Sequence, residues 1–270
     1  MQCGLFAEPS PGVFALMPAA EFLRDAHPWS LRGAYTVQPA DVRAWADLGY
    51  SVRTGRSAFE RVHGRSLWDF LRGDPDASAT FDRSMADLSR LETLWLLDAY
   101  DWAQCETVVD VGGGNGALLV ALLRAVPSLR GVLFDLPQVL ARATNSVEAA
   151  GVAPRCQVEG GDFFEGVPAG FDVYVLKRIV YSYDDADAVR ILRRVREAMK
   201  PGGRVLVIEP VRRKRDESGY GALLDMQMLV TGGGRSRDRA ALRALFASAG
   251  LHLRRIIPTP MAALVEGFSA

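Results

Sequence analysis

Residues 107–119 read TVVDVGGGNGALL. A short run rich in valine ends in an acid, is followed by four glycines within five positions, and continues into an apolar run. Valine favours a strand, and glycine permits positive φ angles and the close approach of a ligand. The apolar run predicts a helix whose first N–H groups and positive dipole end face the turn. This stretch therefore predicts a strand, turn and helix that bind a nucleotide-like cofactor.

Two cofactors fit this turn. Gly112, Gly114 and Ala117 match the spacing of the dinucleotide-binding pattern, which allows alanine at its third position. Gly112, Gly114 and Gly116, with Asp110 two residues earlier, fit the turn of an S-adenosylmethionine (SAM) site equally well. The turn alone leaves both cofactors open.

Composition excludes several classes of protein. The chain has 270 residues, 49% hydrophobic content and a net charge of zero, which gives no support to a nucleic-acid partner. No apolar run is long enough to span a membrane, and no signal peptide is visible. Cys3, Cys105 and Cys156 lack metal-site or redox spacing, and the three histidines form no pair. We expect a cytoplasmic protein with reduced thiols and no metal site.

The second half of the chain alternates between strand and helix patterns. Strands joined by helices predict an α/β fold with a mostly parallel, doubly wound sheet. The last two strands, separated by a loop with prolines at 258 and 260, predict an antiparallel hairpin at one edge. That ending is unlike an ordinary dinucleotide fold and favours SAM. The expected strands are 107–111, 129–134, 155–158, 171–176, 204–208, 251–257 and 262–265.

The first half divides into two segments. Residues 1–33 predict a hairpin and one helix, which are too small to bury a core alone and must pack on another part of the protein. Residues 34–103 are expected to be helical, with a break at 73–75, and to carry a stripe of aromatic and methionine side chains. Trp68 and Met85 are our candidates for the substrate pocket, together with Met226 from a helix expected at 218–231.

Polar and aromatic side chains follow the ends of the expected parallel strands, where an α/β sheet binds its ligand. An acid at the end of the second strand can accept both hydroxyls of a ribose. An acid and an aromatic ring after the third strand suit the amino group and the face of adenine. In chain order these side chains are Asp110, Asp135, Asp162, Phe163, Lys177 and Glu209.

With these residues in place, the sequence resembles the SAM-dependent small-molecule O-methyltransferases of the caffeic-acid and hydroxyindole type, including bacterial enzymes that tailor antibiotics. The resemblance extends from about Gly4 to the C-terminus. It is carried by His63-Gly64 with Trp68, DVGGGNG at 110–116, FDLP at 134–137, GDFF at 161–164, Leu176-Lys177, MKPGGR at 199–204 and GGR at 233–235.

The resemblance implies a class I methyltransferase-like Rossmann fold over residues 104–270 and an aromatic or polyketide-like hydroxyl as the methyl acceptor in secondary metabolism. It implies that Asp135 holds the ribose, that Lys177 lies beside the cofactor, and that Gly112 lies against its methionine part. The expected cofactor-binding set is Asp110, Gly112, Gly114, Asp135, Leu136, Asp162, Phe163 and Lys177.

The sequence departs from the family at its start. The family has an N-terminal winged-helix domain that forms an intertwined dimer. Only the final hairpin and helix of that domain correspond to residues 1–33. We therefore expect a shortened dimerisation domain and, if a homodimer forms, a weakened one.

The family's catalytic base is also replaced. The family has a His-Asp-Trp triplet where this chain has Tyr181-Ser182-Tyr183, and the acid that would orient the histidine is Ser236. A tyrosine titrates near pH 10 and is a poor base at pH 7. Glu209 remains in its place, and we expect Tyr181 to contact the acceptor.

Methyl transfer without the histidine remains possible, because proximity and orientation supply much of the rate. The leading hypothesis is therefore a SAM-dependent O-methyltransferase that lacks the usual base. A second hypothesis is a SAM-binding homologue with non-methylating chemistry, such as a hydroxylation or a pericyclic step. A third is an inactive remnant, and a nicotinamide enzyme rests only on the glycine pattern.

Overall fold

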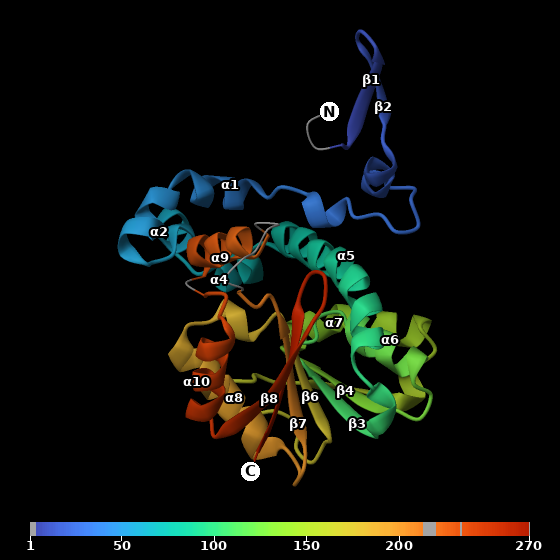
Figure 1. Cartoon of the computed structure of the whole chain (residues 1–270), viewed down its shortest axis with the longest axis vertical. Coiled ribbons are helices and arrows are strands. Elements are labelled where there is room, and N and C mark those ends of the chain that lie inside the picture. The colour runs from blue at the N-terminus through green and yellow to red at the C-terminus, as the bar shows by residue number, and fades with distance from the viewer. Residues whose placement is uncertain (1–3, 213–219, 233, 270) are drawn as a thin grey trace.

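The computed structural model describes residues 4–212, 220–232 and 234–269. A seven-stranded sheet with the order β5-β4-β3-β6-β7-β9-β8 forms its centre (Figure 1). The valine-rich segments predicted as strands become these strands, because β-branched side chains pack well on a pleated surface. Their bounds are β3 Thr107–Val111, β4 Arg130–Asp135, β5 Cys156–Gly160, β6 Val173–Lys177, β7 Arg204–Glu209, β8 Leu251–Pro258 and β9 Ala263–Ser269.

Strand direction confirms the predicted mixed sheet. β3 pairs in parallel with β4 and β6, while β9 is antiparallel to both β7 and β8. β9 extends beyond the predicted 262–265 to Ser269, because its pairing with β7 continues to Phe268 and its pairing with β8 continues to Ser269. The chain order reverses between β3 and β6, and this switch point is where an open α/β sheet binds ligands.

Helices cover both faces of the sheet. α6 (Ala117–Ala125), α7 (Pro137–Ala149) and the end of α5 (Pro75–Ala99) pack on one face. α8 (Asp185–Ala198) and α10 (Arg239–Ser248) pack on the other. The leucine-rich sequence of α6 explains its position, because four of its leucines are almost completely buried against the sheet.

A layer of helices lies over the carboxyl edge of the sheet (Figure 1). α9 joins this layer from the second half of the chain, since the Trp45 indole donates to Gln227 and the Ser57 hydroxyl to the Val230 carbonyl. The predicted break at 73–75 is confirmed: α4 ends at Gly73, and Asp74 caps α5. The layer consists of α1 Pro39–Ala46, α2 Leu48–Thr54, α3 Ala58–His63, α4 Leu67–Gly73 and α9 Tyr220–Thr231.

The N-terminal hairpin of β1 (Phe6–Ser10) and β2 (Val13–Leu16) projects away from the rest of the chain (Figure 1). Its apolar side chains are exposed, with Phe14 at 65%. The predicted helix after it is a 3₁₀ helix, Pro18–Leu23. The expected packing occurs further on, where Arg90 of α5 donates to the carbonyl of Ser30. Among the described residues, no helix is both long and apolar enough to cross a membrane.

Candidate cofactor and acceptor site

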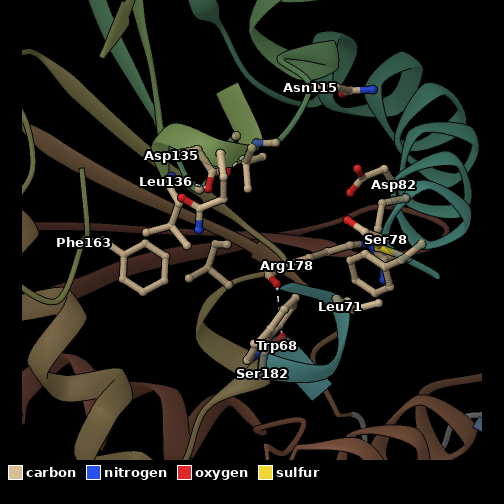
Figure 2. Close-up of a pocket in the computed structure, with 18 of the residues that line it drawn as sticks. Trp68, Leu71, Ser78, Asp82, Asn115, Asp135, Leu136, Phe163, Arg178 and Ser182 are labelled. Atoms are coloured by element: carbon tan, nitrogen blue, oxygen red, sulfur yellow. Dashed lines mark hydrogen bonds between the residues drawn. The ribbon is translucent and has the colours of Figure 1, made fainter. Parts of the chain in front are cut away.

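A cavity of about 650 Å³ lies between the carboxyl ends of the strands and the helical layer (Figure 2). Its lining comes from α4 and α5 on one side and from the ends of β3, β4 and β6 on the other. This volume is in the range of cavities that hold small-molecule ligands and cofactors. The position matches the one expected from the switch point of the sheet.

The glycine-rich turn forms part of the cavity wall in a conformation that requires glycine. Gly112, Gly114 and Gly116 have φ angles of 68°, 60° and 78°. Gly113 has no room for a side chain, because a Cβ there would lie 2.5 Å from Leu133 and 2.7 Å from the Asp110 carboxylate. The backbone of the turn is therefore free to lie directly against a ligand.

Asp135 is fixed by the backbone on both sides of it. Its Oδ2 accepts from the Gly114 amide at 2.8 Å, and its Oδ1 accepts from the Leu136 amide at 2.7 Å. Burial raises the pKa of Asp135, and these two hydrogen bonds oppose that change. A carboxylate oxygen that accepts one hydrogen bond keeps capacity for another. Asp135 therefore keeps acceptor capacity for a ligand, and its ribose role stays a prediction.

Asp110 presents a buried acceptor at the end of β3. It is 2% exposed, and its Oδ2 has no hydrogen-bond partner among the described residues. Burial raises the pKa of Asp110 to about 7, although Lys177 on the adjacent strand opposes this shift. A buried acceptor without a donor is costly, which favours a ligand that supplies one.

Asp162 and Phe163 line the cavity next to β5, as the sequence predicted. The Asp162 Oδ1 accepts from the Phe164 amide at 2.8 Å, which fixes the carboxylate. Phe163 packs in a cluster with Phe164 and Tyr183, at ring-centroid distances of 5.1 and 6.0 Å. The result is a rigid aromatic face beside a fixed acceptor.

The helical layer supplies the opposite wall. Trp68 of α4 and Met85 of α5 both line the cavity. The Trp68 ring meets Phe81 edge to face, with centroids 5.7 Å apart. Because Trp68 is still 41% exposed, its ring has a surface that a flat aromatic ligand could cover.

A buried ion cluster under the cavity was missed by the sequence analysis. Glu92 of α5 is 1% exposed and lies between Lys177, 3.3 Å away, and the guanidinium of Arg178. Burial by itself would raise the pKa of Glu92, but the two cations outweigh it and hold the pKa below its usual range. The only signal in the sequence was one acid within the apolar stripe of a helix, and nothing there indicated its partners.

Three expected site residues lie outside the cavity lining. Tyr181 is 5% exposed and turned into the protein, because its hydroxyl accepts from Arg178 and its amide donates to Glu209. Glu209 is fully buried, and burial raises its pKa to about 7. Met226 belongs to α9, whose described contacts are with the other helices of the layer. Ser182 and Tyr183 occupy the lining next to Tyr181.

The family model described as an O-methyltransferase domain matches residues 45–252. This chain belongs to that family. The match includes the glycine turn, Asp135, the segment after β5 and most of the helical layer.

The similar proteins include an O-methyltransferase and a hydroxylase. The chain is 39% identical over 257 residues to phenazine O-methyltransferase PhzM of Lysobacter antibioticus, which covers 95% of this chain and 75% of the relative. It is also 39% identical over 235 residues to aclacinomycin 10-hydroxylase RdmB of Streptomyces purpurascens, covering 80% of this chain and 62% of that protein.

A solved structure gives the same picture. The O-methyltransferase NcsB1 of neocarzinostatin biosynthesis, in complex with SAM and 2-hydroxy-5-methyl naphthoic acid, has a TM-score of 0.86 and 38% identity to this chain. The similarity covers all of this chain and 82% of NcsB1. NcsB1, which has this fold, therefore binds SAM and an aromatic acid together.

Proposed function

We propose that this protein is a SAM-dependent O-methyltransferase of secondary metabolism that acts on a hydroxyl group of an aromatic or polyketide-like small molecule. The observation that carries the proposal is the fixed Asp135 carboxylate beside the glycine turn, in a chain of the O-methyltransferase family. The aromatic acceptor would lie against Trp68 and Met85.

The residues of the cavity fit SAM. Asp135 with Leu136 would hold the ribose, Asp162 and Phe163 would border the adenine, and Gly112 and Gly114 would lie against the methionine part. The unpaired Oδ2 of Asp110 would accept a hydrogen bond from the cofactor, and Lys177 would lie beside it. Bound SAM supplies an activated methyl group, so the acceptor oxygen bonds to the methyl carbon as the carbon–sulfur bond breaks, leaving S-adenosylhomocysteine.

The protein's own contribution is to position the acceptor and exclude water. Tyr181 occupies the position in the sequence where the family has its histidine. Its hydroxyl accepts from Arg178, and burial raises its pKa. It is therefore a poor base at neutral pH. Glu209 would position Tyr181 by accepting a hydrogen bond from its backbone amide. Proximity and orientation then account for the acceleration of methyl transfer, and the proton of the acceptor hydroxyl passes to solvent.

A second candidate function is a non-methylating reaction, such as hydroxylation, on the same bound cofactor. It is favoured by the similarity to the hydroxylase RdmB and by the tyrosine at position 181. This candidate predicts that SAM binds but that its methyl group is retained.

One experiment distinguishes these functions. The purified chain is titrated calorimetrically with SAM, with NAD as control, and then incubated with SAM and a panel of phenols and hydroxynaphthoates. Micromolar SAM binding, no NAD binding and release of S-adenosylhomocysteine with a methylated phenol are expected. SAM binding without methyl release would favour the second candidate, and a folded sample that binds no SAM would refute both.

The proposal also covers the cellular location and the oligomeric state of the enzyme. We place it in the cytoplasm, where the thiols of Cys105 and Cys156 would stay reduced. Exposed apolar side chains on the N-terminal hairpin, such as Phe6 and Phe14, would support a homodimer. Sedimentation velocity over a range of concentrations would test for it.

A further inference from the structure

Arg178 has an unusual backbone conformation next to the cavity. Its φ of 59° makes it the one non-glycine residue with positive φ in the described part of the chain. The backbone amide donates to the Ile208 carbonyl at 2.8 Å, and the Ser182 hydroxyl donates to its carbonyl at 3.3 Å (Figure 2). A strained position that is held by its surroundings in this way often belongs to a functional site.

The side chain of Arg178 is held equally firmly. Its Nε donates to Glu92 Oε2 at 3.1 Å, its Nη2 donates to the other oxygen of Glu92, and its Nη1 donates to the Tyr181 hydroxyl at 3.3 Å. The side chain is 9% exposed, and the residue lines the cavity. The guanidinium therefore keeps a fixed position at the cavity without the entropy of a mobile arginine.

Charge is divided unevenly across the cavity. Asp135 interacts electrostatically with both Asp110 and Asp82 near the glycine turn. That acidic side suits a cofactor that carries a sulfonium and an ammonium group. On the other side, Glu92 lies between two cations, Lys177 and Arg178, and Lys177 also interacts with Asp110. The Arg178 guanidinium thus places a fixed positive charge at the cavity lining.

We infer that Arg178, held by Glu92 and supported by Lys177, stabilises the ionised acceptor hydroxyl and thereby selects acceptors that bind as phenolates. This inference rests on the proposed function and deepens it. A positive charge in a buried site stabilises an anion far more than it would in water. The hydroxyl loses its proton to solvent on binding, and Arg178 itself neither gains nor loses one. The site thus needs no histidine base.

The test compares two probes of similar shape at one pH above 7. The full chain is titrated with 4-nitrophenolate and with uncharged 4-nitroanisole, with and without S-adenosylhomocysteine. The wild type is expected to bind the phenolate about tenfold more tightly, equivalent to about one pKa unit. Arg178→Met should abolish this preference, and Glu92→Gln, which removes the neutralising carboxylate, should increase it. A wild type that binds the two probes equally, or does not bind the phenolate, overturns the inference.

Three controls make the result specific. The double variant Glu92→Gln with Arg178→Met removes the buried Glu92 carboxylate together with its guanidinium partner, so it tests the loss of the guanidinium even if the single variant misfolds. Arg193→Met removes an exposed arginine of α8 that donates to the Ser248 carbonyl, and should keep the preference. A preference for 4-nitrobenzoate that equals the one for the phenolate, and is lost with Arg178, would mean recognition of a carboxylate and would also overturn the inference.

The experiment distinguishes failure of the Arg178 inference from failure of the proposed methyltransferase function. The titration is followed by absorbance and needs no methyl transfer. A chain that prefers the phenolate through Arg178 but releases no methyl group would refute the methyltransferase proposal and leave the role of Arg178 standing.

Discussion

The carboxylate of Asp135 accepts hydrogen bonds from the backbone amides of both Gly114 and Leu136. One acid therefore joins the end of β4 to the turn that follows β3. The same contacts that would fix the carboxylate for a ribose also hold the turn in shape, so its loss should affect ligand affinity and local order together.

Replacement of Asp135 by alanine is expected to weaken SAM binding by about thirtyfold. This corresponds to about 2 kcal/mol, the size expected when charge-assisted hydrogen bonds are lost. Isothermal titration calorimetry of the variant measures the change. Glu165→Gln, at an exposed acid on the loop after β5, is the matched control and should leave the affinity unchanged. An unaltered affinity in Asp135→Ala would remove the ribose role.

Replacement of Gly113 by alanine is expected to destabilise the protein by about 1–3 kcal/mol, the usual cost of overpacking. The new Cβ would lie 2.5 Å from Leu133 and 2.7 Å from Asp110, and both side chains are buried. Urea unfolding measures the loss. Gly166→Ala is the control, since a Cβ there meets nothing within 4 Å. Equal stability of the two variants would contradict the described packing.

The buried carboxyl of Glu209 is expected to make stability depend on pH. Burial raises its pKa from 4.5 to about 7, although Arg237 and the Tyr181 amide oppose the shift. Between these values the folded state keeps a proton that the unfolded state has lost, so stability falls as pH rises through this window. Glu209→Gln removes this dependence.

The expected consequence is that Glu209→Gln and the wild type have similar stability near pH 4.5. At pH 8 the variant should be more stable by up to about 3 kcal/mol. Urea unfolding at both pH values gives the difference in stability between the variant and the wild type. For the control Glu165→Gln, this difference should be the same at both pH values. A stability advantage that is largest at low pH would show that Glu209 is ionised when folded.

The cofactor side of the cavity could be predicted from the sequence because its residues follow single strands. Asp110, Asp135, Asp162 and Lys177 each come at or just after the end of a parallel strand, and strand ends meet at one edge of the sheet. Local pattern and topology were sufficient to bring them together.

The acceptor side could not be predicted in the same way. Glu92 meets Arg178 across 86 residues, through the docking of α5 over β6, and no local pattern specifies that packing. Tyr181 illustrates the same limit. The sequence predicted that Tyr181 contacts the acceptor, but its hydrogen bonds to Arg178 and Glu209 turn it away from the cavity.

Replacement of Trp68 by alanine is expected to weaken binding of an aromatic probe such as 4-nitrophenolate by about tenfold, while the affinity for SAM stays within about twofold. The ring is at the cavity and 41% exposed, so its loss removes a stacking surface without opening the core. Trp29→Ala, at a similarly exposed tryptophan of the N-terminal segment, is the control. Equal effects of the two variants on the probe would argue against Trp68 as an acceptor contact.

Replacement of Tyr181 by phenylalanine distinguishes a catalytic contact from a positioning one. The change removes the hydroxyl that accepts from Arg178. It keeps the hydrogen bond that the backbone amide of residue 181 donates to Glu209. If Tyr181 only positions the guanidinium, kcat/KM should fall by about fivefold, because the lost hydrogen bond is long, at 3.3 Å, and the guanidinium keeps its two hydrogen bonds to Glu92. The binding preference for the phenolate should weaken in parallel. A loss of about a hundredfold or more in kcat, with the phenolate preference intact, would instead indicate direct proton transfer. Because the tyrosine is buried beneath Arg178, we expect the first result.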